Sequence, residues 1–173
     1  HRKAAEQGDA NASCNLAMCY ERGRGVEMNY GEALKWYSLA LAKDDSSFVA
    51  RTGLGRMNRL GKGVPKDFAE ALRFLRPAAT KGWPPAQYEL GLMYANGEGV
   101  SQDYVEAYKW YNLAAYAQDD AATTRDTLAG QMTPVEITEA QRLTREFKAG
   151  KESVSGISVS PKRTAKQRAS GTG

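Results

Sequence analysis

The side chains that most often carry enzyme chemistry are scarce in this sequence of 173 residues. It contains one histidine, His1, and two cysteines, Cys14 and Cys19. A single histidine excludes Ser-His-Asp triads, Cys-His pairs and histidine-ligated metal sites within the chain. On one helix, the five-residue spacing of the cysteines places their Cα atoms too far apart for a disulfide. These counts favour a binding module over an enzyme.

Two pairs of adjacent acids, Asp44 with Asp45 and Asp119 with Asp120, stand where helices are expected to meet. Acids at such junctions cap helices and favour the helix dipole, and neither pair has the spacing of a calcium loop. Three Gly-x-Gly segments resemble phosphate loops, but no expected strand precedes any of them, as phosphate-binding motifs require. We therefore expect no catalytic residue, no cofactor and no metal ligand.

The net charge of +4 comes from one end of the chain. Residues 1–150 contain 19 Lys and Arg against 19 Asp and Glu, whereas residues 151–173 contain five against one. The body is therefore not expected to bind nucleic acid. No apolar run approaches the about 18 residues of a membrane span, so we expect no membrane-spanning segment.

The elements that position these side chains follow from an internal repeat. The motif Gly-x-Gly-Val occurs at 23–26, 61–64 and 97–100. Three kinds of residue recur at fixed distances from each valine. A leucine lies ten residues before it (Leu16, Leu54 and Leu90), an aromatic residue ten after it (Trp36, Phe74 and Trp110) and an alanine fourteen after it (Ala40, Ala78 and Ala114). This shared register predicts three copies of one structural unit.

Each copy is expected to form two antiparallel helices. Small and apolar residues before Gly-x-Gly recur at every third or fourth position, which marks one helical face. The glycines supply the left-handed backbone that ends the first helix, and Asn29, Asp67 or Asp103 caps the second. One hairpin cannot bury its apolar stripe alone, so we predict stacked hairpins over 10–43, 47–81 and 85–117.

The pattern in residues 97–114 resembles the Sel-one-like repeat family, a branch of the tetratricopeptide-like superfamily. It runs Gly-x-Gly-Val, Asp/Asn-aromatic-x-Glu-Ala, Lys-Trp-Tyr and Ala. The resemblance implies an all-α, right-handed α-solenoid whose concave side, lined by the first helices, holds a protein partner. Copies one and three match strongly, and the resemblance covers roughly residues 4–118. Copy two departs from the pattern at Asn58, at Phe74-Leu75 and at Pro77, which stands inside its second helix.

The chain divides into six expected parts. These are the end of a truncated upstream repeat (1–8), three repeats (9–45, 46–81 and 82–118), C-terminal capping helices (119–149) and a disordered basic tail (150–173). Thr133, Pro134 and Glu136 have the types and spacing of a helix start. The tail has no apolar periodicity, so we expect its removal to leave the fold intact.

The expected function is a non-catalytic protein–protein interaction module, an adaptor or scaffold that acts as a monomer. The alternative is a hydrolase-like or enzyme-associated activity, as proposed for some cysteine-rich relatives of this repeat family. This chain lacks the repeated cysteine pairs of those relatives. Bacterial members often carry a C-terminal cap, so the expected compartment is a bacterial cytoplasm or periplasm.

The concave face is expected to expose the positions eleven, eight, five and four residues before each valine. The candidate partner-binding residues among them are Asn15, Met18, Arg22, Arg56, Arg59, Glu89, Leu92 and Asn96. Residues 47–60 contain three arginines and no acid, which predicts a positive centre and a partner that is acidic with an apolar anchor. Alternatively, these arginines lie in solvent over their own helix.

Two further positions carry expectations of their own. Trp83, between the second and third repeats, either contacts the partner or anchors a packed loop. Gly53 aligns with Asn15 and Glu89, which indicates no packing role and predicts that alanine there stabilises the helix. Gly55 aligns with Ala17 and Gly91, which indicates close helix packing.

Overall fold

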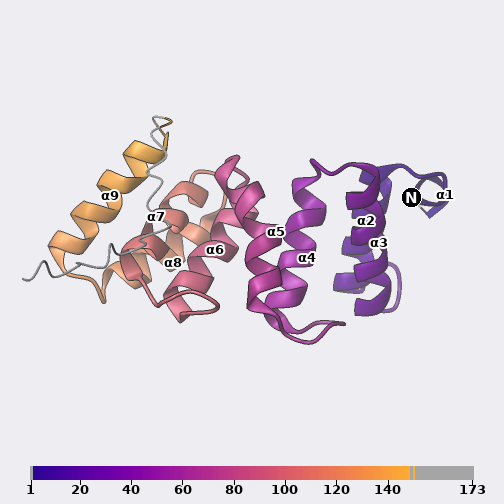
Figure 1. The fold of residues 1–173 in the computed structure, drawn as a ribbon, viewed down its shortest axis with the longest axis horizontal. Coiled ribbons are helices and arrows are strands. Elements are labelled where there is room, and N and C mark those ends of the chain that lie inside the picture. Colours follow the sequence, from indigo (N-terminus) through magenta and orange to yellow (C-terminus); the bar gives the residue numbers. More distant parts are fainter. Residues whose placement is uncertain (1, 149, 151–173) are drawn as a thin grey trace, which may run out of the picture.

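The computed structural model describes residues 2–148 and 150. Within these residues the chain is all α-helical and contains no strand (Figure 1). The helices are α1 (Arg2–Glu6), α2 (Ala10–Arg22), α3 (Tyr30–Lys43), α4 (Phe48–Leu60), α5 (Phe68–Thr80), α6 (Pro84–Asn96), α7 (Tyr104–Ala114), α8 (Asp119–Ala129) and α9 (Pro134–Lys148). The prediction of a dispensable tail at 150–173 lies, apart from residue 150, outside the described residues.

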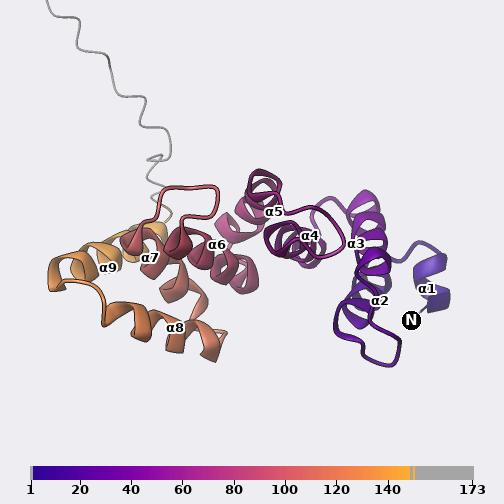
Figure 2. The same ribbon diagram turned by 90° about the horizontal axis from the view of Figure 1, so that it is seen from below.

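The helices pair into three hairpins, α2–α3, α4–α5 and α6–α7, and consecutive hairpins pack through α3–α4 and α5–α6. The hairpins follow one another along the long axis in the order of the sequence, as Figures 1 and 2 show. This arrangement confirms the predicted solenoid of stacked helical hairpins, and the helix ends lie within three residues of the predicted ones.

The turns between the helices of each hairpin follow the predicted chemistry. The glycine that ends each first helix has a φ of 67–69°. The side chain of Asn29, Asp67 or Asp103 accepts a hydrogen bond from the backbone N–H three residues later. These caps fix where each second helix begins, and so they fix the register of the hairpins.

The aromatic residues at fixed repeat positions fill the core. Trp36, Tyr37, Trp110 and Tyr111 are all buried, so these rings pack inside the repeats. In copy two, Leu75 is fully buried at the position of the tyrosine. The second helix of that copy, α5, continues as one helix through Pro77.

The structure corrects the expectation for Gly53. A Cβ atom there would lie 2.5 Å from Cζ of Tyr37, which comes from the preceding hairpin. Alignment of first helices with one another does not include this ring, so the absence of a packing role was wrongly predicted. At Gly55 a Cβ atom would lie 2.5 Å from Cγ of Leu75, which confirms the predicted close packing.

The last two helices both pack against α7. The ring of Phe147 on α9 meets that of Trp110 edge to face, with centroids 5.4 Å apart. Ala140 on α9 is fully buried, and Thr133 and Glu136 form the predicted reciprocal cap at its start. These contacts confirm that α9 covers the third repeat.

None of the described helices is both long and apolar enough to cross a membrane.

Candidate functional site

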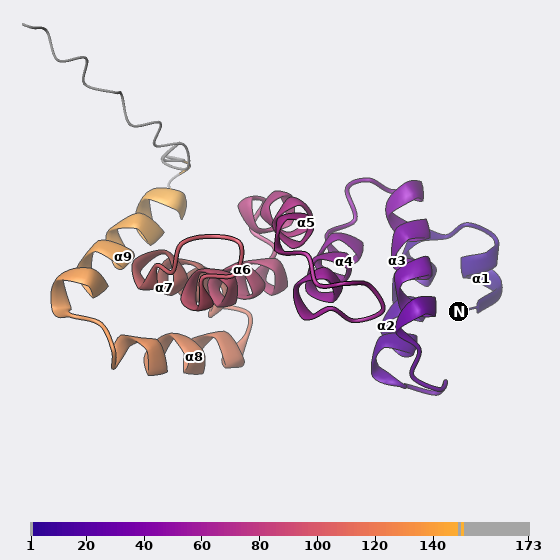
Figure 3. The same cartoon turned by 60° about the horizontal axis from the view of Figure 1, so that its bottom comes forward.

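The first helices of the hairpins form one face of the solenoid. In Figure 3, α2 and α8 lie at the two sides of this face, and α4 and α6 are set back between them. The candidate partner-binding residues all lie on α2, α4 and α6. The face therefore joins side chains that are far apart in the sequence.

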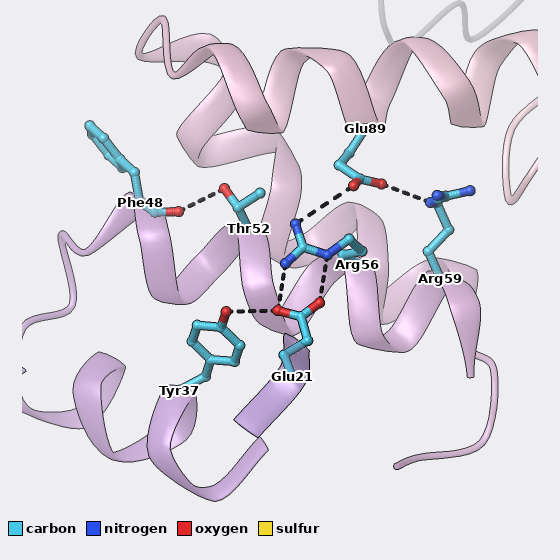
Figure 4. A network of polar contacts seen from close by, with 7 residues as sticks. All are labelled: Glu21, Tyr37, Phe48, Thr52, Arg56, Arg59 and Glu89. Carbon is cyan, nitrogen blue, oxygen red and sulfur yellow. Dashed lines mark hydrogen bonds and ion pairs between the residues drawn. The ribbon is translucent and has the colours of Figure 1, made fainter. Parts of the chain in front are cut away.

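A series of charged side chains crosses the middle of this face (Figure 4). We call it the charge ladder; it consists of Glu21 on α2, Arg56 and Arg59 on α4, Glu89 on α6 and Glu98 in the following loop. Arg56 donates to Glu21 from Nε and Nη2, at 2.9 and 2.7 Å, and its Nη1 lies 3.9 Å from Glu89 Oε1. Arg59 donates to Glu89 at 2.9 Å and to Glu98 at 3.1 Å.

Glu21, Arg59 and Glu89 are buried, and Arg56 and Glu98 are half-buried; this burial shapes the electrostatics of the ladder. Burial raises the pKa of Glu21, but hydrogen bonds from Arg56 and from the Tyr37 hydroxyl outweigh it and hold that pKa below its ordinary value. For Glu89 burial outweighs the two arginines, so its pKa is raised. Burial and the Glu21 carboxylate raise the pKa of Tyr37, which keeps the hydroxyl protonated as a donor.

The predicted positive centre of the groove is wrong. The ladder contains two arginines and three glutamates, so its negative charges outnumber its positive charges by one. The alternative, arginines lying in solvent over their own helix, is also wrong, because both bind acids from neighbouring repeats. Arg51, the third arginine of α4, pairs with Asp45 at 2.6 Å.

A cavity of about 300 Å³ lies on the N-terminal side of the ladder. We call it the N-terminal pocket; its lining comes from α2, α3, α4 and the start of α6 and consists of Met18, Arg22, Tyr37, Val49, Thr52, Gly53, Arg56, Trp83 and Pro85. Most of these side chains are apolar. Trp83 lines the pocket and packs against Phe48, with ring centroids 6.2 Å apart; that it contacts a partner stays a prediction.

Arg22 is the exposed cation at this pocket. Within the described part of the chain it forms no ion pair, whereas Arg56 in the same pocket is bound to Glu21. A charge that is not already neutralised is the one available to an incoming group. Of the two arginines that line this pocket, Arg22 is therefore the one that is not held in an ion pair.

A second cavity, of about 320 Å³, lies between α6 and α8. We call it the C-terminal pocket; its lining consists of Leu92, Ala95, Asn96, Tyr111, Thr123, Thr124, Thr127, Leu128 and Gln131. It combines an apolar floor with hydroxyl and amide groups. The helix α8, expected only to cap the array, thus supplies a wall of the groove.

The structure distributes the eight candidate residues among these three features. Met18, Arg22 and Arg56 line the N-terminal pocket, and Leu92 and Asn96 line the C-terminal pocket. Arg59 and Glu89 belong to the ladder, together with Arg56. Asn15 is exposed and lines neither pocket. That these residues bind a partner stays a prediction.

Several residues that line the pockets are not among the candidates expected from the sequence. Val49, Thr52 and Pro85 lie at helix starts outside the four repeat positions used to select candidates, and Thr123 and Thr127 belong to α8. The two threonines are four residues apart on one face of α8, which is a signal that the sequence does contain. Among the residues that the structure describes, no group of three or more His, Cys, Asp or Glu side chains is placed to hold a metal ion.

Comparison with known proteins gives the same pattern of repeats. The Sel1 repeat model matches residues 1–9, 10–45, 49–83 and 84–119. A crystal structure of a Sel1 repeat protein from Oxalobacter formigenes is 35% identical and has a TM-score of 0.57, covering 73% of this chain and 94% of that one. The protective antigen c5321 of uropathogenic Escherichia coli, described as having an SLR fold, has a TM-score of 0.59 at 26% identity, covering 86% of this chain and 39% of that one.

Two fungal regulators are similar in sequence. Chitin synthase regulatory factor 3 of Schizosaccharomyces pombe is 36% identical over 118 residues, and chitin synthase regulator SKT5 of Saccharomyces cerevisiae is 34% identical over 126. The matches cover 66% and 71% of this chain but only 12% and 18% of those proteins. The family match extends over more than half of the chain, and the chain belongs to the Sel1 repeat family.

Proposed function

We propose that this chain is a non-catalytic protein-interaction module, an adaptor or scaffold that holds a segment of a partner protein in the groove formed by α2, α4, α6 and α8. The observation that carries the proposal is a pair of mostly apolar pockets on that face, separated by a charge ladder whose members satisfy one another. Membership of the Sel1 repeat family and similarity to proteins named as regulators support a regulatory role.

The N-terminal pocket is proposed to take a large apolar side chain of the partner. Its walls include Met18, Val49 and Pro85, and burying an apolar side chain there contributes about 1.5–3 kcal/mol. An acidic group next to that anchor would face Arg22, the exposed cation of the pocket. The partner chemistry expected from the sequence is thereby kept, but with Arg22 in place of Arg56 and Arg59 as its charge contact.

The C-terminal pocket is proposed to select polar as well as apolar groups. The hydroxyls of Thr123 and Thr127 bond to backbone carbonyls of their own helix, and each hydroxyl oxygen still has lone pairs that accept hydrogen bonds. The amides of Asn96 and Gln131 add donors and acceptors. A partner segment that follows the groove would therefore present its apolar anchor at one end and amide or hydroxyl groups at the other.

The test is a selection of phage-displayed peptides on the immobilised chain, followed by fluorescence-polarisation titration of the enriched peptides. The variant Val49→Glu places a charge in the N-terminal pocket. Its matched control is Val135→Glu on α9, where valine is largely exposed. We expect enriched peptides to share a large apolar residue and to lose affinity at least about tenfold with Val49→Glu while keeping it with Val135→Glu.

The acidic part of the partner chemistry is tested separately. Arg22→Gln should weaken the peptides that carry an acid beside the apolar residue and leave neutral peptides unchanged, with the exposed Arg24→Gln as control. Enrichment of no peptide, or equal affinity for Val49→Glu and the wild type, would overturn the groove as the binding site. Equal effects of Arg22→Gln and Arg24→Gln would remove Arg22 from it.

A further inference from the structure

The second repeat carries a positive charge that the groove does not use. Residues 46–81 contain eight Lys and Arg against two Asp and Glu. The neighbouring repeats are acidic, with four against six in residues 9–45 and one against four in residues 82–118. Although residues 1–150 carry no net charge, the second repeat is therefore strongly basic and the repeats on either side of it are acidic.

Half of these eight cations are neutralised by acids of the same chain. Arg51, Arg56 and Arg59 pair with acids of the first and third repeats. Arg73 pairs with Glu70 one turn away on α5. The other four, Lys62, Lys66, Arg76 and Lys81, form no ion pair with any residue that the structure describes.

These exposed cations are distributed along α5. Arg73, which pairs with Glu70, and Arg76 are three residues apart on one face of the helix. Lys66 comes two residues before its first residue, and Lys81 follows its last residue. All of these side chains are exposed. Lys66 lies over the ring of Phe68 at 5.7 Å, and Arg73 over Phe74 at 4.5 Å.

A fifth cation extends this face toward the first repeat. Lys62 lies in the turn before α5, with its Nζ 5.0 Å from the centre of the Tyr30 ring. Stacking on aromatic rings restricts long side chains without removing their charge. We call the surface formed by Lys62, Lys66, Arg73, Arg76 and Lys81 the α5 basic face.

We propose that the α5 basic face is a second docking surface and that it binds a short acidic segment of a protein. From Lys66 to Lys81 the face is about 22 Å long, a length that about seven residues of extended chain can span. Carboxylates spaced along such a segment would pair with Lys62, Lys66, Arg76 and Lys81, which form no ion pair among the described residues, and would compete with Glu70 for Arg73. The site lies on a second helix and is therefore separate from the groove.

The charge of the surroundings favours a short protein segment over a membrane or a nucleic acid. An anionic bilayer or a long polyphosphate chain would extend beyond the single basic repeat onto the acidic repeats on both sides. Once the acids that pair with Arg51, Arg56 and Arg59 are set aside, those repeats carry no excess of cations to hold it. An acidic segment of limited length contacts the basic face alone.

The test uses a fluorescein-labelled peptide of alternating Glu and Gly, matched to the length of the face, and measures polarisation with the whole chain at low and high salt. Arg76→Glu with Lys81→Glu reverses two free cations. The matched control is Lys35→Glu with Lys43→Glu, which makes the same change of net charge at exposed residues of α3. Circular dichroism checks that both variants keep their helices.

We expect the peptide to bind at low salt, to weaken at least about tenfold with the α5 variant and to change less than about threefold with the α3 control. Added salt should weaken it further. Val49→Glu should leave this binding unchanged, so failure of the groove and failure of the basic face are distinguishable.

Any one of four results would overturn the proposal. Three of them are absence of peptide binding at low salt, equal loss with the α3 control, and equal or tighter binding of phosphatidylserine vesicles or single-stranded polyuridine at the same face. Self-association of the wild-type chain that the α5 variant abolishes would assign the face to a second copy and would equally overturn it.

Discussion

Replacing Gly53 by alanine should destabilise the chain, although alanine is the better helix former. Gly53 lies in the middle of α4, where the change from glycine favours the helix by about 1 kcal/mol. The added methyl group would lie 2.5 Å from Cζ and 2.6 Å from Cε2 of Tyr37. The sign of the effect therefore depends on whether this ring can move away.

The environment of Tyr37 holds the ring in place. Its side chain is 1% exposed, and its hydroxyl donates to Glu21 at 2.9 Å. Carbon atoms in contact lie about 3.5–4.0 Å apart, so the ring must withdraw by about 1 Å, which stretches the bond to Glu21. Overpacking of this kind costs about 1–3 kcal/mol. After the gain in helix propensity of about 1 kcal/mol, the net loss is up to about 2 kcal/mol, or up to about 6 °C in Tm.

Urea and thermal unfolding followed by circular dichroism measure this loss. Gly31→Ala is the control for helix propensity, because Gly31 lies on the exposed part of α3 and its added Cβ meets only the cap oxygen of Asn29, at 3.3 Å. In a Tyr37→Phe background the ring is no longer bound to Glu21, so the loss from Gly53→Ala should shrink. A Tm that Gly53→Ala raises, or an equal loss in both backgrounds, would refute the reasoning.

The remaining predictions concern the ladder and the cap. Arg56→Met leaves the buried Glu21 and Glu89 without their shared cation and should cost about 3–5 kcal/mol in urea unfolding at neutral pH; a loss below about 1 kcal/mol would contradict a buried pair. The pKa of Glu21 is lowered in the folded state, so its contribution to the free energy of unfolding is present above the unfolded pKa and is lost as pH falls through the folded pKa. Glu21→Gln should therefore make the free energy of unfolding less dependent on pH at acid pH. An unchanged pH dependence there would contradict this. Phe147→Ala, which removes the half-buried ring against Trp110, should cost about 2 kcal/mol, whereas Val135→Ala on the same helix should change stability by less than about 0.5 kcal/mol.

The repeat architecture was accessible from the sequence because it depends on local chemistry that recurs. Each Gly-x-Gly turn and each Asn or Asp cap acts within a few residues of its own position, and three copies in register indicate the same unit three times. Stacking then follows from the apolar stripe that a single hairpin leaves uncovered. The C-terminal cap was predictable for the same reason, since Thr133 and Glu136 define the start of α9 locally.

The charge of the groove could not be predicted from the sequence of one helix alone. Arg56 and Arg59 meet acids that are 30 to 39 residues distant in the sequence, so a window over α4 contains none of their partners. A signal was nevertheless present: Glu21, Arg56 and Glu89 stand five, eight and eleven residues before the valines of successive repeats. Alternating charges on such a diagonal predict pairs between neighbouring first helices.

Gly53 shows a second limit of alignment between equivalent helices. The ring that excludes a side chain there belongs to the second helix of the preceding repeat. In the third repeat Glu89 aligns with Gly53, and the second helix of the repeat before it carries Leu75 at the position of Tyr37. The size allowed at one position is therefore set by a residue in another helix that varies between copies.

The charge ladder also bears on how the solenoid bends. Repeat arrays flex through small changes in the rotation between adjacent repeats, and the ladder connects α2 to α4 and α4 to α6 on the inner side of the curve. Widening that side would separate buried carboxylates from their guanidinium groups, which is costly. The ladder therefore resists a change in the curvature of the inner face, and the groove proposed above would already be ordered before a partner binds. Binding then requires less ordering of the protein itself, which lowers the entropic cost of association.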